Sequence, residues 1–341
     1  MPSAQERYTV RIAGSETSFS CAGDDVLLRA AQRAGLAFPY ECNVGSCGNC
    51  KFELLEGEVA MQWPDAPGWT DKDRQRGRFL GCQARLSGDV TIKLRPDARY
   101  APVQRPRRMV AVLTQRRPIT HDMEEFRFTL EQPQSFEPGQ YALLNLPGVE
   151  GVRAYSMSNV PGDGSAWEFQ VRRVPGGRGS SALMDRVHPG TRLEIDGPYG
   201  MAWLRRDAPR DILCLAGGSG LAPMLSIARA ASAEPALQQR QLHFLYGART
   251  PADVCGEDML RALSGWGTRI HYESAVSAPP PGQPWPGATG FVHDLAEQRF
   301  GDSLAGMEIY FAGPPLMATA VQQMLLAHKV PFTQVHFDQF Y

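Results

Sequence analysis

The sequence lacks a long apolar run, a signal peptide and an excess of charge of either sign. Its formal net charge is −1 at pH 7, so its electrostatics do not favour a nucleic acid or an anionic membrane as a partner. No apolar stretch approaches the roughly 20 residues that a membrane-spanning helix needs. The first residues lead directly into a strand-like run. We therefore expect a soluble, cytoplasmic protein.

Internal repeats are also missing, and the only biased tract is a short proline-rich stretch at 278–282. The chain has 341 residues, and 43% of them are hydrophobic. A chain of this size can bury more than one core, so two or three domains are expected.

Cysteine is scarce, yet four of the seven cysteines form a pattern. Cys42, Cys47 and Cys50 follow the spacing C-x4-C-x2-C, and Cys82 comes much later in the chain. This is the ligand pattern of a plant-type [2Fe-2S] cluster, which is a one-electron carrier. Gly45 and Gly48 suit the loop between the ligands, because glycine permits tight turns and a close approach of backbone N–H groups to sulfur.

Zinc binding and disulfide formation are the alternative interpretations of these four cysteines. Zinc modules usually carry two close cysteine pairs rather than a triplet. Disulfides need an oxidising compartment, which the lack of a signal peptide argues against. The iron-sulfur cluster is therefore favoured. Cys21 and Cys214 lie in apolar, strand-like segments and are expected to be small buried hydrophobic residues, whereas Cys255 is assigned no role.

Residues 1–98 are predicted to form a β-grasp-like domain. Strand patterns occur at 8–12, 19–21, 51–55 and 90–94. Asp24 and Asp25 are predicted to cap a helix that ends at Gly35. Residues 95–108 are rich in proline and arginine and lack periodicity, which indicates a domain boundary.

Two further domains are predicted, at 107–205 and 209–341. The first has regularly spaced short strands and one helix-like segment at 180–187, a pattern typical of an antiparallel β-barrel. Its strands are expected at 110–114, 125–130, 140–146, 153–158, 167–174 and 192–195. The second alternates buried strands with helical segments, which predicts a doubly wound parallel sheet. Its strands are expected at 212–216, 242–246, 269–275 and 308–312.

A glycine-rich turn follows the first strand of the last domain, at 217–220, and Pro223 stands in the helix that comes next. Such a turn lets backbone N–H groups approach a pyrophosphate at a helix N-terminus. The pattern is G-x-G-x-x-P rather than the usual dinucleotide fingerprint, so a purely structural turn is an alternative. Two more glycine-bearing strand ends, at 246–249 and 312–315, favour a nucleotide site at the carboxyl edge of the sheet.

Several motifs then appear in a fixed order: R-x-Y-S-x-x-N at 153–159, G-x-x-S at 177–180, G-P-Y-G at 197–200, the glycine turn, and G-P-P at 313–315. In this order they resemble the ferredoxin-NADP reductase superfamily. With a plant-type ferredoxin at the N-terminus, the chain is similar to reductase components of bacterial multicomponent oxygenases. Segments 38–42, 53–59, 63–68 and 335–338 look most like toluene monooxygenase reductases, which act in aromatic hydrocarbon catabolism.

The resemblance implies roles for individual residues. Tyr155 would lie against the flavin ring of FAD, and Ser156 would hydrogen-bond near flavin N5. The FAD phosphates would meet Arg153 and a helix start formed by Gly179, Ser180 and Ser181. The remaining residues that the resemblance places near the nicotinamide nucleotide are Gly218, Gly220, Pro223, Tyr246, Arg249, Gly313 and Pro314.

At the C-terminus, Asp338, Phe340 and Tyr341 would approach the flavin, where an aromatic ring can occupy the nicotinamide position and an acid can assist protonation. A frayed chain end is the alternative. Many relatives carry cysteine where this chain has Ala312, so no essential thiol is expected there. Relatives that use NADPH carry a Ser-Arg pair where this chain has Ser277 and Ala278, which favours NADH, although Arg249 is near.

The resemblance implies that NADH delivers hydride to FAD and that electrons leave singly through the [2Fe-2S] cluster. The expected acceptor is a Rieske-type ferredoxin or the hydroxylase of a toluene-type monooxygenase, and the chain is expected to be a monomer. The reductase of a Rieske ring-hydroxylating dioxygenase is the alternative enzyme. A redox-sensing regulator is the alternative from another class, and no added DNA-binding segment favours it.

Overall fold

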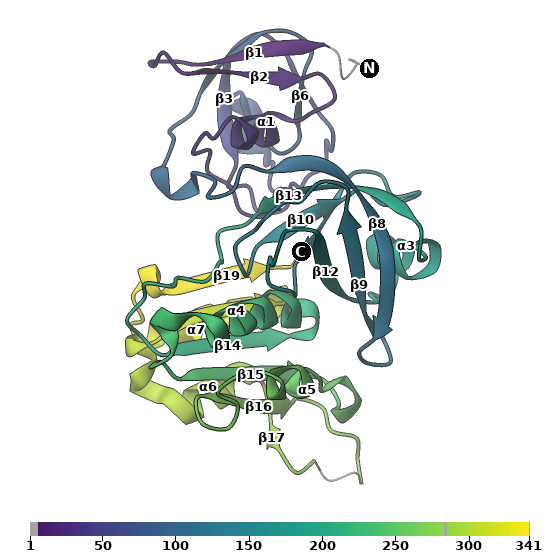
Figure 1. The fold of residues 1–341 in the computed structure, drawn as a ribbon. Helices are drawn as coiled ribbons and strands as arrows, with labels where there is room; N and C mark the ends of the chain where they lie inside the picture. The colour runs from purple at the N-terminus through teal and green to yellow at the C-terminus, as the bar shows by residue number, and fades with distance from the viewer. Residues whose placement is uncertain (1–5, 283–284, 341) are drawn as a thin grey trace. The chain divides into compact units, whose positions relative to one another are not determined.

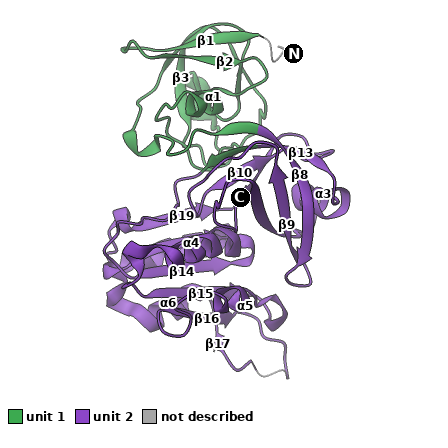
Figure 2. Ribbon diagram, viewed as in Figure 1, with its two compact units in different colours: residues 1–108, 196–199 green, residues 109–195, 200–341 purple. Residues whose placement is uncertain are grey.

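The structure is a computed structural model that describes residues 6–282 and 285–340 (Figure 1). The chain divides into two compact units (Figure 2). The first unit contains Met1–Arg108 together with Asp196–Tyr199, and the second contains Met109–Ile195 and Gly200–Tyr341.

The first unit is built on a five-stranded sheet with the order β2-β1-β7-β3-β5. β1 and β7 pair in parallel, whereas β1 with β2, β3 with β7 and β3 with β5 pair in antiparallel fashion. Alternate residues of β1, such as Val10 and Ile12, are buried, as expected for a strand with one face on the core. The strands and helices are β1 (Arg7–Ile12), β2 (Ser18–Ala22), α1 (Leu27–Arg33), β3 (Lys51–Glu56), β4 (Val59–Met61), α2 (Asp71–Gln75), β5 (Arg78–Leu80), β6 (Ala84–Leu86) and β7 (Val90–Lys93).

The start of α1 differs from the prediction. Val26 is the N-cap residue and no side chain caps the helix, so the expected capping by Asp24 and Asp25 is wrong. Both carboxylates are engaged elsewhere: Asp25 pairs with Arg33 at 2.6 Å, and Asp24 pairs with Arg108 at 2.6 Å. Ion pairing with arginine has displaced the local capping bond that these residue types usually make.

The second unit begins with a six-stranded sheet of order β11-β10-β13-β8-β9-β12, in which the pairs β10–β11, β8–β9 and β9–β12 are antiparallel. A bridge between Met157, just after β11, and Phe169 of β12 joins the two ends of this order and closes the sheet into a barrel. The elements are β8 (Arg107–Pro118), β9 (Met123–Leu130), β10 (Tyr141–Leu144), β11 (Arg153–Ser156), β12 (Ala166–Arg172), α3 (Arg178–Arg186) and β13 (Arg192–Tyr199). β8 starts at Arg107, so the predicted linker ends where this strand begins.

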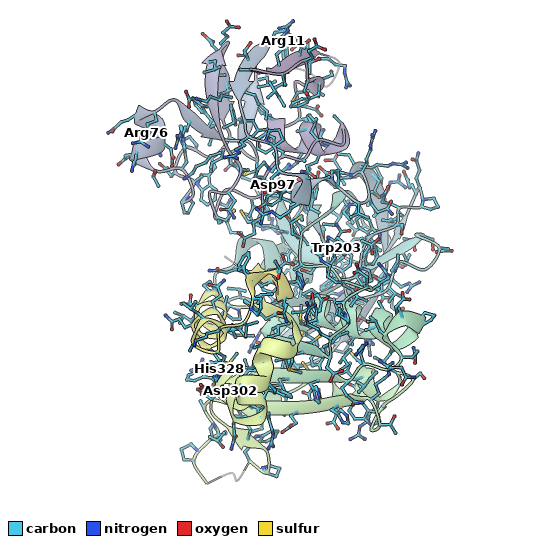
Figure 3. All side chains as sticks on the ribbon, turned by 90° about the vertical axis from the view of Figure 1, so that its left-hand side faces the viewer. Arg11, Arg76, Asp97, Trp203, Asp302 and His328 are labelled. Atoms are coloured by element: carbon cyan, nitrogen blue, oxygen red, sulfur yellow. The ribbon has the colours of Figure 1, made fainter. Side chains whose placement is uncertain are left out.

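The chain then crosses to a parallel sheet. The Arg205 guanidinium stacks on the ring of Trp203, a residue labelled in Figure 3, at 3.4 Å from the ring centroid. The backbone N–H of Arg205 donates to the hydroxyl of Tyr310 at 2.9 Å. The sheet has the order β17-β16-β15-β14-β18-β19, and every pair in it is parallel. This is the predicted doubly wound domain.

Helices cover both faces of this sheet. α4 and α5 pack on one face around Met224 and Leu260, while α6 and α7 pack on the other around Leu295 and Val321. None of the helices in the described residues is long and apolar enough to cross a bilayer. The elements are β14 (Ile212–Gly217), α4 (Leu221–Ala233), β15 (Leu242–Ala248), α5 (Glu257–Arg261), β16 (Ile270–Val276), β17 (Ala288–Thr289), α6 (Val292–Phe300), β18 (Glu308–Gly313), α7 (Pro315–Ala327) and β19 (Val335–Gln339).

Candidate cofactor sites

The four patterned cysteines come together in the first unit. The thiol of Cys47 donates a hydrogen bond to the sulfur of Cys42, which is the main reason that the pKa of Cys42 falls to about 5. Hydrogen bonding to Cys50 and burial raise the pKa of Cys82, and the charge of Cys42 also contributes. Cys50 and Cys82 are buried, whereas Cys42 and Cys47 are partly exposed. Four sulfur atoms this close, none in a disulfide, fit a cluster with thiolate ligands.

The loop that carries three of these cysteines turns backbone N–H groups toward sulfur. The N–H of Cys47 donates to the Cys42 sulfur at 3.3 Å, and the N–H of Asn49 donates to the Cys47 sulfur at 3.5 Å. The turns rely on positive φ angles of 98° at Gly45 and 78° at Gly48, which glycine adopts without strain. The loop therefore supplies hydrogen bonds as well as ligands, as the glycines predicted.

In the second unit, β11 brings Arg153 and Tyr155 against the start of α3. A side chain added at Gly179 would lie 2.9 Å from the Tyr155 hydroxyl and 2.9 Å from Cγ of Arg153. Only glycine allows this close approach. Burial raises the pKa of Tyr155 well above its usual value, so its hydroxyl stays protonated.

The same corner concentrates positive charge. Burial is the first cause that lowers the pKa of Arg153, and the nearby charge of Arg178 lowers it further. The Arg153 guanidinium donates to the carbonyl groups of Glu150 and Val152, at 3.1 and 2.9 Å. Within the described chain, neither arginine forms an ion pair with a carboxylate. Two arginines without a carboxylate beside a helix N-terminus fit an anion such as a phosphate.

The three serines of this region have different environments. The Ser180 hydroxyl is buried and accepts a hydrogen bond from the N–H of Val174 at 3.0 Å. It thereby holds the turn that precedes α3. Ser181 is half-buried in the first turn of α3. Ser156 is buried at the end of β11, opposite Tyr141 of β10.

The glycine turn at the end of β14 is packed against β18. A Cβ at Gly220 would lie only 2.0 Å from the carbonyl oxygen of Ala312, so no other residue fits without moving the turn. Gly218 has a positive φ of 55°. Pro223 is buried in the first turn of α4. This backbone arrangement fits a pyrophosphate, which backbone N–H groups bind best where no side chain intervenes.

Neighbouring strand ends meet the glycine turn. The hydroxyl of Tyr246, at the end of β15, donates to the Gly218 carbonyl at 3.2 Å, and burial raises the Tyr246 pKa well above its usual value. Arg249 follows β15 and is exposed, while its carbonyl accepts from the N–H of Ala278 at 2.8 Å. The Ser277 hydroxyl donates to the Ala248 carbonyl at 3.3 Å. The ends of β14, β15 and β16 therefore lie together.

Two residues that the sequence did not single out lie beside the turn. The sulfur of Met317, in the first turn of α7, would lie 2.5 Å from a Cβ at Gly217 and 2.7 Å from one at Gly313. Arg172, at the end of β12, lies 3.7 Å from the corresponding position at Gly218. Met317 follows the G-P-P motif by two residues, but neither residue belongs to a recognisable pattern.

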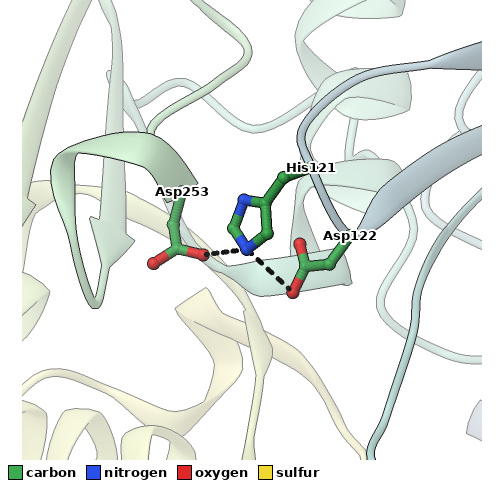
Figure 4. A group of neighbouring side chains, drawn as sticks. All are labelled: His121, Asp122 and Asp253. Carbon is green, nitrogen blue, oxygen red and sulfur yellow. Dashed lines mark ion pairs between the residues drawn. The ribbon is translucent and has the colours of Figure 1, made fainter.

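Arg172 joins the barrel to the parallel sheet through two carboxylates. It pairs with Asp122 at 2.6 Å and with Asp253 at 2.6 Å. His121 lies beside the same two carboxylates, which makes the group in Figure 4 a possible metal-binding set. The Arg172 guanidinium already supplies the positive charge that these carboxylates need, so we interpret the group as an ion-pair network between the two halves of the second unit.

The C-terminal strand β19 extends the parallel sheet. Asp338 pairs with Ala312 of β18 and is buried, with 9% of its surface exposed. The N–H of Phe340 donates to the Gly313 carbonyl at 3.2 Å, and its ring packs on the core of the sheet. Pro314 is the N-cap of α7. Residue 341 lies outside the described chain, so Asp338 and Phe340 are the tail residues that the structure places, and both lie beside β18.

Comparison with known proteins finds a family domain over each of these three regions. Residues 10–87 match a 2Fe-2S iron-sulfur cluster binding domain, residues 110–203 an oxidoreductase FAD-binding domain, and residues 214–323 an oxidoreductase NAD-binding domain. The chain is 39% identical to the ferredoxin–NAD(P)+ reductase CarAd of Metapseudomonas resinovorans, over 98% of this chain and 100% of that protein. The chain belongs to this reductase family.

Other members of the reductase family serve different oxygenases. The chain is 39% identical to the ferredoxin–NAD+ reductase component of an alkene monooxygenase system from Xanthobacter autotrophicus, over 95% of this chain and 98% of that one. It is 32% identical to the xylene/toluene monooxygenase electron transfer component XylA of Pseudomonas putida, over 98% and 93%. The ferredoxin reductase in carbazole 1,9a-dioxygenase matches the structure with a TM-score of 0.91 at 36% identity, over 98% and 99%.

Membership of the reductase family confirms three predictions. The chain is an oxidoreductase, its cofactors are a [2Fe-2S] cluster, FAD and a nicotinamide nucleotide, and its fold combines a ferredoxin domain, an FAD-binding barrel and an NAD-binding parallel sheet. The resemblance to reductase components of oxygenases is confirmed as well.

Proposed function

We propose that this reductase accepts electrons from NADH and passes them one at a time to the ferredoxin or hydroxylase of an oxygenase system. The observation that carries the proposal is the gathering of four cysteine sulfurs in a chain that also has an FAD-binding and an NAD-binding domain. FAD supplies two-electron chemistry with the nicotinamide, and the cluster supplies one-electron transfer.

At the cluster, the proposed ligands are Cys42, Cys47, Cys50 and Cys82. The remaining cysteines are poor candidates, because they fall outside the spacing pattern: Cys255 lies in a loop of the second unit, and Cys21 and Cys214 lie within strands β2 and β14. Both are fully buried and behave as small hydrophobic residues, as predicted.

At the flavin, Arg153 and the α3 segment of Gly179, Ser180 and Ser181 are proposed to bind the FAD phosphates. Tyr155 is proposed to lie against the flavin ring, and Ser156 to donate a hydrogen bond near flavin N5. The contact between position 179, Arg153 and Tyr155 supports a single site for these groups. The buried hydroxyl of Ser180 supports a role in shaping the turn, with the backbone N–H groups of the helix start facing the phosphates.

At the nucleotide, the proposed binding residues are those that meet at the carboxyl edge of the parallel sheet: Gly218, Gly220, Pro223, Tyr246, Arg249, Gly313 and Pro314. Asp338, Phe340 and Tyr341 are proposed to lie on the flavin side of this edge. The bond from Phe340 to Gly313 supports this position for the tail. The chain's own task there is to orient the nicotinamide over the flavin and to exclude water.

We propose that NADH is the preferred donor. The segment after β16 carries Ser277 and Ala278, so no arginine follows the serine to grip a 2′-phosphate. The Ser277 hydroxyl is also engaged with the Ala248 carbonyl. Arg249 directly follows β15 and is exposed, so its positive charge could still attract a phosphate at the carboxyl edge of the sheet.

The physiological acceptor is the finer part of the proposal. We propose a Rieske-type ferredoxin or a diiron hydroxylase of a toluene-type monooxygenase, acting with a monomeric reductase in the cytoplasm. The 32% identity to a xylene/toluene component supports this choice. The likeness to a carbazole dioxygenase reductase favours the second candidate, a Rieske ring-hydroxylating dioxygenase. We also propose to divide the chain into domains at 1–98, 107–205 and 209–341.

Reconstitution tests the proposal. The purified reductase would be mixed with NADH and, in separate reactions, with a Rieske ferredoxin, a diiron hydroxylase and ferricyanide. We expect rapid ferricyanide reduction and transfer to at least one of the two protein acceptors. Failure to reduce any acceptor, ferricyanide included, would contradict the proposal and favour a redox-sensing protein without turnover.

A further inference from the structure

Helix α1 places a buried arginine beside the cysteine loop. Only 7% of the Arg29 surface is exposed. Its guanidinium donates from Nε to Oδ1 of Asn43 at 3.2 Å and from Nη2 to the backbone carbonyl of Asn43 at 3.2 Å. Across the described residues, Arg29 forms no ion pair with a carboxylate. A buried cation without a counter-charge is costly unless a negative group lies near it.

Its partner Asn43 directly follows Cys42 and has only 1% of its surface exposed. Its backbone has a positive φ of 56°, a conformation that asparagine, aspartate and glycine tolerate better than other residues. Its side-chain nitrogen Nδ2 is buried and has no hydrogen-bond partner in the part of the chain that the structure describes. Such a donor is normally satisfied in a folded protein.

The contact with Arg29 fixes which way the amide of Asn43 is turned. A guanidinium can only donate hydrogen bonds, so the amide oxygen must face it. The amide NH2 group then points away from Arg29. Asn43 directly follows Cys42 in the loop that carries three of the four cysteines, so a cluster bound by these cysteines would bring sulfur acceptors to this part of the loop.

We propose that Arg29 and Asn43 form a positioning pair that raises the reduction potential of the [2Fe-2S] cluster. Asn43 Nδ2 donates a hydrogen bond to a sulfur of the cluster or of its ligands, and Arg29 orients that amide and supplies a positive charge. This inference rests on the proposed assignment of Cys42, Cys47, Cys50 and Cys82 as ligands.

The sign of the effect follows from charge. Reduction adds one negative charge to the cluster, and both a hydrogen bond to sulfur and a nearby cation stabilise the reduced form more than the oxidised form.

Two variants of Asn43 in the full-length reductase test the hydrogen bond. Asn43→Asp keeps the shape of the side chain and the contact with Arg29 but replaces the donor with an acceptor. Asn43→Gly removes the donor without adding charge. Both residues tolerate the positive φ. In redox titrations followed by electron paramagnetic resonance, we expect the reduced-to-oxidised ratio at the wild-type midpoint to fall about tenfold in Asn43→Asp, which is about 59 mV for one electron.

Two variants of Arg29 test the charge. Arg29→Gln removes the cation and should also lower the midpoint, whereas Arg29→Lys keeps the charge and should restore part of the shift. Arg11→Gln is the matched control, because it removes the same charge from an exposed position in the first unit and should leave the midpoint unchanged. Double-resonance spectra in H2O and D2O should show an exchangeable proton coupling that both Asn43 variants lose and the control retains.

The outcomes separate this inference from the ligand assignment. An unchanged midpoint and unchanged proton coupling in both Asn43 variants would overturn the inference, even if Arg29→Gln fails to assemble a cluster, because that pattern indicates a purely structural role. A wild-type reductase that shows no cluster signal would instead contradict the assignment of the four cysteines.

Discussion

The two units of this reductase are suited to their cofactors by different means. In the first unit, four cysteine side chains gather around one point, and each is an individual covalent ligand in the proposed site. In the second unit, the proposed sites depend on backbone shape and on the absence of a side chain at two positions. Only Gly220 fits the turn beside β18, and Gly179 leaves room for Arg153 and Tyr155 at the start of α3. Loss of a cysteine ligand should therefore abolish cluster binding, whereas a side chain added at one of these glycines should only weaken binding of the nucleotide or the flavin.

The largest effect is expected for Cys82→Ala. Removing one of four ligands should abolish the signal of the reduced cluster, because the other three sulfurs cannot complete the coordination of both irons. Flavin absorbance and ferricyanide reduction by NADH should persist, since their proposed site lies in the second unit, but transfer to cytochrome c should collapse. Absorbance and paramagnetic resonance spectra check both halves of this prediction.

Cys214→Ala is the control for that variant. Cys214 is equally buried but lies in β14 of the second unit. It should keep a normal cluster signal and normal cytochrome c reduction. A normal cluster signal in Cys82→Ala would show that Cys82 is not a ligand.

A large but graded effect is expected for Gly220→Ala. The added methyl group would lie 2.0 Å from the Ala312 carbonyl, so the turn must move away from β18. We expect KM for NADH to rise about tenfold, which corresponds to about 1.4 kcal/mol of lost binding, while the cluster spectrum stays unchanged. Steady-state kinetics with ferricyanide measure the change.

Gly306→Ala provides the matched control in the same parallel-sheet domain. No atom lies within 4 Å of a Cβ placed at Gly306, so this variant should bind NADH normally. Equal KM values for the two variants would contradict a nucleotide-binding role for the glycine turn.

A smaller effect is expected when donor specificity is changed. In Ala278→Arg, the new guanidinium would follow Ser277 beside the end of β15, where it could pair with a 2′-phosphate. We expect kcat/KM for NADPH to rise about tenfold relative to NADH, since a charged hydrogen bond contributes about 1.5–3 kcal/mol. Ala278→Gln should not show this gain. Equal use of the two donors by the unchanged reductase would contradict the preference for NADH.

Both kinds of site, the cysteine group and the glycine-rich turns, could be predicted from the sequence. Cysteine spacing and glycine-rich strand ends are local signals, because the residues that act together are close in the chain or stand at equivalent strand ends. They singled out the four cysteines that the structure brings together, which are the proposed cluster ligands, and the turn at Gly218–Gly220. Strand alternation likewise predicted the barrel strands and the four central strands of the parallel sheet to within a few residues, but it missed the edge strands β17 and β19.

What the sequence did not reveal depends on contacts between distant segments. Arg172 pairs with Asp122 and also with Asp253, which lies 81 positions beyond Arg172 in the chain. Arg29 bonds to Asn43 from a helix, and no spacing rule predicts that contact. The prediction that Asp24 and Asp25 cap α1 was wrong for a similar reason, since both carboxylates form ion pairs with Arg33 or Arg108. Long polar side chains pair with groups that are close in space but distant in the sequence, and the secondary-structure propensity of a local segment does not predict such pairs.

The smallest expected effect is a difference in pH dependence between the two units. In the first unit, burial alone would raise the pKa of Asp73, but hydrogen bonds from Thr70 and Lys51 outweigh it and lower the pKa below the usual 3.8. Stability from Asp73 is therefore present above that value and is lost as the pH falls through the lowered pKa. The loss of this stability should be measurable only below about pH 3.8, the usual pKa of an aspartate.

In the second unit, His328 behaves in the opposite way. It bonds to Glu297 at 3.0 Å and lies 3.4 Å from Asp302, its neighbour in Figure 3. The bond to Glu297 is the main reason that its pKa rises above the usual 6.5. Its ion pairs should stabilise the α6–α7 region fully below pH 6.5, and this contribution should be lost as the pH rises through the raised pKa.

His328→Gln tests this last difference. The temperature at which flavin is released from the second unit, followed by fluorescence, should be lower in the variant than in the unchanged reductase at pH 6 or below. The two should converge once the pH exceeds the raised pKa, where His328 is neutral in both the folded and the unfolded chain. The shift should be small, because surface ion pairs contribute little. A difference that stays constant across this range would show that His328 acts through packing rather than through its charge.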